Sequence, residues 1–341
     1  MPIRCPNSWA LNNREVNMPN NLLLSCAGRR VELLQIWKRT FLDLGIDAQV
    51  VAADAQPFAP AFVLADRQAI VPKVCDPHFV DAMLRTCQNN DVRWVIPTID
   101  TELPILSEAR ETFLSHGIEI MVSDTETIAI ASDKRRTHEW FVANGFPTFR
   151  QADIATALAD PDWVYPCFAK PACGSRSIGA RRIESREALC QRQAESDGND
   201  VVESLGHGVE VTVDAWISPK TGKCTCVVPR QRIEVRDGEV AKAKTIDAPE
   251  IIKCVRNVAE KLPGVRGTIC VQLFYEPSTK EIALMEINPR FGGGYPLTDA
   301  AGGYFTRWLI EDSLGLPSTT NEDWMRNLVM LRYDQSCYIK G

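Results

Sequence analysis

The feature that most constrains the fold is a regular alternation of short apolar and longer amphipathic segments between residues 21 and 122. The apolar segments predict strands and the amphipathic ones predict helices. Strands are expected at 21–26, 47–53, 69–71, 94–97 and 118–122, and helices at about 31–44, 79–88 and 102–115. This order predicts a parallel sheet with helices on both faces, whose sites lie at the carboxyl ends of the strands.

The loops at those strand ends carry polar residues. The first has Gly28-Arg29-Arg30, the second ends in Asp54, and the fourth leads into Asp100 and Glu102. One glycine followed by two arginines does not match the G-x-G-x-x-G pattern, which excludes a dinucleotide site. Arg29 and Arg30 could hold an anionic substrate group or form a solvated helix start. The roles of Asp100 and Glu102 stay open.

Composition narrows the class of protein. A chain of 341 residues, 45% hydrophobic and 24% charged, is typical of a globular enzyme with more than one core. Its net charge of -6 gives no footprint for nucleic acid or an anionic membrane. Without a signal peptide or a long apolar run, the chain is expected in the cytoplasm. Twelve scattered cysteines and four histidines favour neither a disulfide framework nor a zinc site at Cys224 and Cys226.

The second half of the chain has a different pattern. Residues 1–20 form a polar arm, and a helix is expected over 132–145, with Ser132 as its N-cap and Gly145 as its end. Period-two alternation then predicts antiparallel strands at 201–205, 210–217, 224–232, 271–276 and 282–287, with helices near 249–261 and 305–314. The fold class is therefore α/β followed by α+β.

Two segments suit a nucleotide. Lys170 ends a strand and precedes a small-residue loop that contains Gly174, Ser175 and Ser177. Such a loop can present a cation and backbone N–H groups to phosphate, although an ordinary hairpin with an exposed lysine is the alternative. Glu203 could accept from an adenine amino group. Alternation puts Glu210 on one face of the next strand, where an acid can bind ribose hydroxyls or simply face solvent.

Oxygen ligands and arginines gather further on. Gln272, Glu286 and Asn288 supply hard oxygens on two strands, which suits Mg²⁺ together with substrate phosphates. Glu286 lies in an apolar run, and an unpaired buried acid there would cost several kcal/mol. Arg290, followed by three glycines, could reach a phosphoryl group or a carboxylate. Arg232 lies on a strand that could form another wall of the site.

Taken in order, these residues resemble the ATP-grasp superfamily. The nearest resemblance is to short single-unit proteins similar to the ATP-binding halves of carbamoyl-phosphate synthetase large subunits, over about residues 21–316. The resemblance is carried by Lys134, Lys170 with its loop, Glu203, Glu210, Gln272 and the run Glu286-Ile-Asn288-Pro-Arg290. It implies a loose arm (1–20), a pre-ATP-grasp lobe (21–125), a small lid lobe (126–205) and a large lobe (206–341).

The resemblance also implies roles. Residues expected to bind ATP are Lys134, Lys170, Ser175, Ser177, Glu203, Ser204, Leu205 and Glu210. Those expected to hold Mg²⁺, with Mn²⁺ as a substitute, are Gln272, Glu286 and Asn288, and those expected to act in catalysis are Arg290, Lys170 and Arg232. Arg176 departs from the usual glycine-rich loop.

The expected activity is that of an ADP-forming ligase of the amino-acid or peptide type, which joins a small-molecule carboxylate to an amine, often that of an amino acid, through an acyl phosphate. Alternatives are a bicarbonate-using carbamoyl-phosphate-type or carboxylating enzyme, and an ATP-binding protein without turnover. The absence of a biotin or glutaminase region argues against complete carbamoyl-phosphate synthesis. Relatives suggest a homodimer, and neither substrate can be identified from the sequence.

Overall fold

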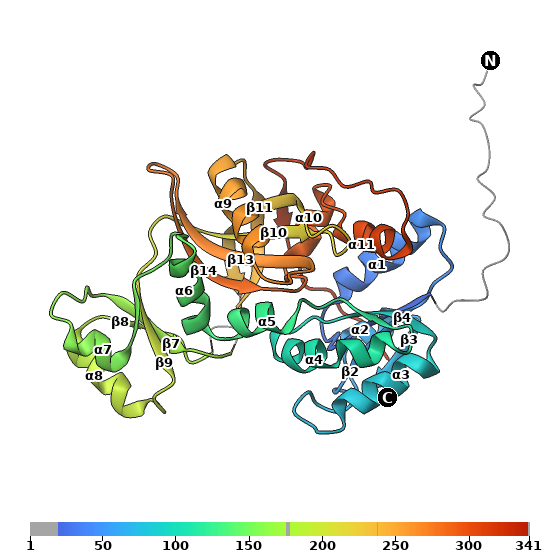
Figure 1. Cartoon of the computed structure of the whole chain (residues 1–341), viewed down its shortest axis with the longest axis horizontal. Helices are drawn as coiled ribbons and strands as arrows, with labels where there is room; N and C mark the ends of the chain where they lie inside the picture. Colours follow the sequence, from blue (N-terminus) through green and yellow to red (C-terminus); the bar gives the residue numbers. More distant parts are fainter. Residues whose placement is uncertain (1–19, 175–177, 237, 340–341) are drawn as a thin grey trace, which may run out of the picture.

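The computed structural model describes residues 20–174, 178–236 and 238–339. Nearly all of the predicted arm, together with Ser175 and Ser177, lies outside these ranges. The described chain forms three sheets with helices packed against them (Figure 1). None of its helices is both long enough and apolar enough to cross a bilayer.

The first sheet is the predicted parallel one. Its strand order is β3-β2-β1-β4-β5, and every neighbouring pair is parallel. The strands are β1 (Asn21–Leu24), β2 (Val50–Asp54), β3 (Arg67–Ile70), β4 (Val92–Ile96) and β5 (Glu119–Ile120). The helices are α1 (Val31–Leu44), α2 (Pro60–Leu64), α3 (Phe79–Asn89) and α4 (Leu103–Leu114), the last preceded by the 3₁₀ turn η1 (Asp100–Glu102).

Two helices, α5 (Thr125–Ser132) and α6 (Lys134–Ala143), lead into a small antiparallel sheet. Its order is β6-β9-β7-β8, built from β6 (Gln151–Asp153), β7 (Cys167–Pro171), β8 (Arg181–Ile183) and β9 (Asp200–Ser204), with α7 (Ile154–Ala159) and α8 (Arg186–Glu195) beside it. The predicted N-cap of α6 was wrong. Asp133 accepts from the Arg135 N–H, whereas Ser132 ends α5 and donates to the Ile128 carbonyl.

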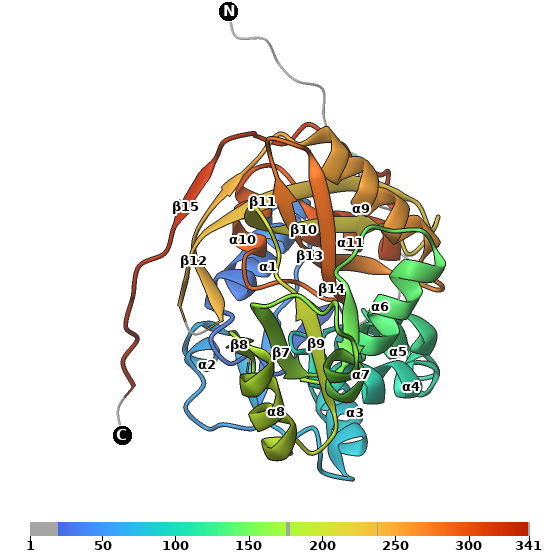
Figure 2. The same ribbon diagram turned by 90° about the vertical axis from the view of Figure 1, so that its left-hand side faces the viewer.

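The third sheet is antiparallel, with the order β14-β13-β10-β11-β12-β15. Its strands are β10 (Val209–Ile217), β11 (Cys224–Arg236), β12 (Glu239–Thr245), β13 (Gly267–Glu276), β14 (Glu281–Asn288) and β15 (Val329–Leu331). Helices α9 (Pro249–Lys261), α10 (Tyr295–Ala300) and α11 (Phe305–Leu314) accompany it. The turned view shows the small sheet below this large one (Figure 2).

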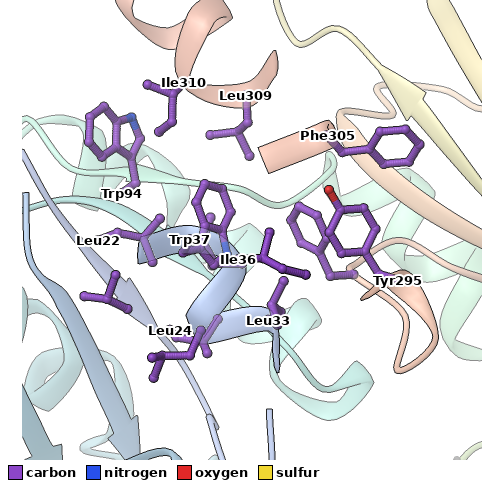
Figure 3. Close-up of a cluster of buried hydrophobic side chains, with 14 of the residues drawn as sticks. Leu22, Leu24, Leu33, Ile36, Trp37, Trp94, Tyr295, Phe305, Leu309 and Ile310 are labelled. Atoms are coloured by element: carbon purple, nitrogen blue, oxygen red, sulfur yellow. The ribbon is translucent and has the colours of Figure 1, made fainter. Parts of the chain in front are cut away.

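The hydrophobic cores are not shared equally among the three sheets. One cluster joins Leu22 and Trp37 of the parallel-sheet region to Tyr295 and Phe305 beside the large sheet (Figure 3). The small sheet instead packs on a cluster of its own. The parallel and large sheets therefore share one core, and the small sheet has a separate one.

Candidate functional site

One face of the large sheet carries a row of polar residues. Glu286 of β14 lies directly opposite Gln272 of β13, which in turn lies opposite Thr212 of β10. Direct antiparallel partners share a face, and Asn288, two residues beyond Glu286, shares it too. The other face buries Val211 and the residues around it against α9. The sheet register therefore brings the three predicted metal ligands together.

A cavity of about 460 Å³ lies between the small and large sheets. That volume is within the range of ligand pockets. Predicted site residues that line it are Lys134, Lys170, Glu203, Ser204, Leu205, Glu210, Arg232, Gln272 and Glu286. The predicted nucleotide residues within the described ranges thus face one cavity, although they come from three segments of the chain.

Apolar side chains line the same cavity and were not predicted. Phe149 and Phe274 pack edge to face with ring centroids 6.0 Å apart, and Phe168 and Met285 also contribute. Phe274 lies two residues from Gln272 on β13 and faces the same side. That spacing was the signal that could have revealed it.

The cations of this cavity are held by different partners. Lys170 Nζ lies 2.6 Å from a carboxylate oxygen of Glu203, and both side chains are buried. The other Glu203 oxygen accepts from Gln151 Nε2 at 2.8 Å. Lys134 Nζ donates to the Gly174 carbonyl at 3.2 Å. Burial lowers the pKa of Lys134, an effect that Glu286 opposes and Lys170 reinforces.

The contacts of Lys170 and Glu210 bear on the alternatives left open for them. Lys170 is buried on a strand paired on both sides, so it is not the exposed lysine of a simple hairpin. Glu210 lies on β10, which is flanked by β11 and β13 and is not an edge strand. Its carboxylate forms an ion pair with Arg232, whose side chain lines the same cavity and is partly buried.

A second, smaller cavity of about 120 Å³ continues from the first. The two share Arg232, Gly238, Gln272 and Glu286 as lining residues. The smaller one adds Asn288 and Arg290 of the predicted set. All predicted site residues within the described part of the chain therefore line one of two adjoining cavities.

Arg290 ties the large sheet to the parallel one. Its Nε and Nη2 donate to the two carboxylate oxygens of Asp100 at 2.7 and 2.6 Å, and Nη2 also lies 3.3 Å from Asn288 Oδ1. Burial alone would lower the pKa of Arg290, but the charge and hydrogen bonds of Asp100 outweigh it and raise that pKa. Asp100, whose role was open, is thus the anion that orients Arg290.

Glu102 holds the loop that presents Asp100. Its fully buried carboxylate accepts from the backbone N–H groups of Thr98 and Ile99, at 2.7 and 3.1 Å, and from the Ser25 hydroxyl. Burial raises the pKa of Glu102, and these hydrogen bonds oppose the rise. Glu102 is a structural residue of this loop, and its side chain faces neither cavity.

The donor set fits a magnesium ion that arrives with phosphate. Gln272, Glu286 and Asn288 offer one carboxylate and two amide groups, and Asn288 Nδ2 donates to Glu286 Oε1 at 3.2 Å. No group of three or more His, Cys, Asp and Glu side chains arranged for a metal occurs among the described residues. Mg²⁺ commonly takes one or two protein carboxylates and completes its shell with substrate phosphates and water.

Comparison with known proteins adds two family matches. The model of the PylC-like N-terminal domain matches residues 22–121, and that of the ATP-grasp domain matches residues 131–294.

Two curated relatives are named as ligases. A D-alanine–D-alanine ligase from Chlorobium chlorochromatii is 28% identical over 217 residues, which is 55% of this chain and 60% of the relative. A 3-methyl-D-ornithine–L-lysine ligase from Methanosarcina acetivorans is 28% identical over 158 residues, or 46% of this chain and 39% of the relative. The chain therefore spans less than two thirds of the length of either relative.

Among solved structures, a biotin carboxylase from Campylobacter jejuni aligns with a TM-score of 0.70 and 17% identity. The alignment covers 91% of this chain and 74% of that one. At that identity the likeness is one of fold.

Proposed function

The chain belongs to the ATP-grasp superfamily, and from this premise we propose that it is an ATP-dependent carboxylate–amine ligase. It activates a carboxylate as an acyl phosphate and then joins it to an amine, releasing ADP and phosphate. The observation that carries the proposal is the pair of adjoining cavities. One is large, partly apolar and lined by two lysines, and the other is small and lined by arginines.

The larger cavity is the proposed nucleotide site. Lys134 and Lys170 are assigned to the phosphates, together with Ser175 and Ser177 of the loop. Glu203, Ser204 and Leu205 are assigned to adenine, between the aromatic walls, and Glu210 to the ribose. Because Lys170 and Glu203 already pair at 2.6 Å, nucleotide entry would redistribute this ion pair between the phosphates and the base.

Gln272, Glu286 and Asn288 are assigned to Mg²⁺, which would neutralise phosphate charge when bound. Arg232 belongs to the wall shared by the two cavities and Arg290 lines the smaller one. We assign both arginines to the transferred phosphoryl group, which they would hold in line with the substrate carboxylate. Phosphoryl transfer depends chiefly on positioning and electrostatic stabilisation. The chain's contribution is to orient these groups and to exclude water from them.

The reaction has two balanced steps. A carboxylate oxygen of the donor attacks the γ-phosphorus, the bond to the ADP oxygen breaks, and an acyl phosphate forms. The amine nitrogen then attacks the acyl carbon, phosphate leaves with the bonding electron pair, and the amine proton passes to phosphate or water.

We also propose that the lobes meet at 125/126 and at 205/206. We further propose that the chain works as a homodimer in the cytoplasm.

The test is a product screen. The purified chain is incubated with MgATP and pairs of small carboxylic acids and amines, and ADP, AMP and phosphate are measured together with the mass of the new compound. Pair-dependent ADP and an amide are expected. Formation of AMP would exclude acyl-phosphate chemistry. ADP release that depends on bicarbonate alone would favour the carboxylating alternative, and nucleotide binding without turnover would favour a binding protein.

A further inference from the structure

The last strand of the large sheet turns its apolar side chains outward and a charged one inward. Within the described ranges β15 pairs only with β12, at the edge of the sheet (Figure 2). Val329 and Leu331 are 48% and 66% exposed, whereas the side chain of Arg332 is only 25% exposed. A shift of one residue would reverse these faces. The observed register therefore calls for contacts that favour a partly buried arginine.

Arg332 connects three segments that are distant in the sequence. Its Nη2 donates to the Gly293 carbonyl, and its Nη1 donates to the Val240 carbonyl at 3.1 Å. The guanidinium also lies 3.4 Å from a carboxylate oxygen of Glu32 and 3.6 Å from one of Glu239. These partners belong to the glycine loop before α10, to β12 and to α1. Hydrogen bonds from a charged group are stronger than neutral ones, so Arg332 joins these segments firmly.

The smaller cavity is lined by three of these partners, Gly293, Glu239 and Val240. Arg332 is not among its lining residues, so it holds this wall from outside. Arg30 lies on the cavity side of the same glycine. Its Nη2 donates to the Thr98 carbonyl at 3.3 Å, and its Nη1 would lie 2.9 Å from a Cβ placed on Gly293. The Gly293 segment is thus held between an arginine of the parallel-sheet lobe and one of the last strand.

The glycine loop depends on such a contact more than most loops. Phe291 and Tyr295 anchor its two ends in a hydrophobic core. The three glycines between them have no side chain to pack and the greatest conformational freedom. The hydrogen bond from Arg332 to Gly293 holds the middle of the loop. Arg290 adjoins the loop, because its Nη1 donates to the Phe291 carbonyl at 3.2 Å.

We propose that Arg332 is a positioning residue for the ligase reaction, which fixes the glycine loop of residues 292–294 beside Arg290. The proposal rests on the ligase function above. It places part of the working site beyond residue 294, where the match to the ATP-grasp domain ends. Because Arg332 lines neither cavity, its loss should displace groups at the reacting centre and leave the nucleotide contacts in place.

The first test is hydrogen exchange, which requires no substrate. The N–H groups of Tyr295 and Leu297 donate to the Gly292 and Gly294 carbonyls, both at 3.1 Å. In Arg332→Ala these two amides should exchange at least about 10-fold faster than in the unaltered chain, since a charged donor to the loop is lost. The amides of α9, which is remote in sequence from the loop, should exchange as before.

The second test is turnover with any substrate pair that supports ADP release. Arg332→Ala should lower kcat about 10- to 100-fold, since a misplacement of about 1 Å can cost about 100-fold in rate. The Kd for MgATP should stay within about twofold. Arg332→Lys keeps a cation but not both donors and should recover part of kcat.

Arg326→Ala is the matched control. Arg326 belongs to the same terminal segment, donates to the Trp324 carbonyl two residues away and lines neither cavity. It should match the unaltered chain in loop exchange, kcat and MgATP affinity. Arg332→Gln, which keeps a neutral donor, replaces the alanine variant in every comparison if that variant is insoluble.

Unchanged exchange of Tyr295 and Leu297 would overturn the proposal, as would an unchanged kcat. A loss of MgATP affinity as large as the loss of kcat would also overturn it, because a general loss of structure would then explain both. The ligase proposal fails on different evidence, namely an unaltered chain that binds no MgATP or releases no ADP with any pair. Hydrogen exchange would still decide whether Arg332 holds the loop.

Discussion

The ion pair between Arg290 and Asp100 permits a quantitative test of how the two sheets are joined at the site. Its two N–H···O bonds, at 2.7 and 2.6 Å, are bidentate, and the side chains are 13% and 26% exposed. Exposed pairs contribute about 0.2–1 kcal/mol, while breaking a fully buried pair costs about 3–5 kcal/mol. This partly buried pair should therefore show a coupling energy of about 2 kcal/mol, or about 30-fold.

The measurement is a double-mutant cycle with Asp100→Asn, Arg290→Lys and the double variant, using urea denaturation for stability. Each single variant should destabilise, and the double variant should be less destabilised than the sum of the two. In addition, kcat should fall in Asp100→Asn, because Arg290 loses the anion that orients it, while nucleotide affinity should hold. A coupling energy below about 0.5 kcal/mol would refute the view that this pair joins the two sheets.

Three further outcomes follow from the site. Glu286→Ala should abolish ADP release and Mg²⁺-dependent nucleotide binding while the circular dichroism spectrum is kept, and an insoluble variant would instead indicate a structural acid. Because the pKa of Lys134 is lowered, nucleotide affinity should be full below that pKa and fall as pH rises through it. Lys134→Arg should move the loss to higher pH in a binding titration, since guanidinium stays protonated, and identical profiles would contradict this. Glu102→Ala should lower the free energy of unfolding by about 3 kcal/mol, because it leaves two buried N–H groups without an acceptor. Glu102→Gln keeps an acceptor, so its free energy of unfolding, measured by urea denaturation, should fall by less. Equal decreases in the two variants would contradict the role of the carboxylate as acceptor.

Most of the fold could be predicted from strong local patterns of apolar residues in the sequence. The helices expected near 249–261 and 305–314 match α9 and α11, because each has an apolar stripe at helical spacing. Elements set by tertiary context were missed. β15 is three residues long and exists through its pairing with β12, and α5 has little amphipathic character to distinguish it from a loop.

The site likewise contains residues whose placement could be predicted from local patterns and others whose placement could not. Glu286 and Asn288 could be placed on one face because a strand has a period of two. The Asp100 partner of Arg290 could not, because 190 residues separate them and only the packing of two sheets brings them together. The buried ion pair of Arg230 with Asp214 could not be predicted either, because the pairing of two neighbouring strands brings these residues together.

The strand directions constrain how a nucleotide and an acceptor would share the site. Along β13 the inward-facing residues are Cys270, Gln272 and Phe274, which line the smaller cavity, both cavities and the larger cavity respectively. Along β11, Arg230 lines only the smaller one and Arg232 lines both. A nucleotide with its base against Phe274 would therefore direct its phosphates toward Gln272. The acyl phosphate would then form at this shared wall, where the amine would add to one face of the carbonyl carbon and phosphate would leave from the resulting tetrahedral centre.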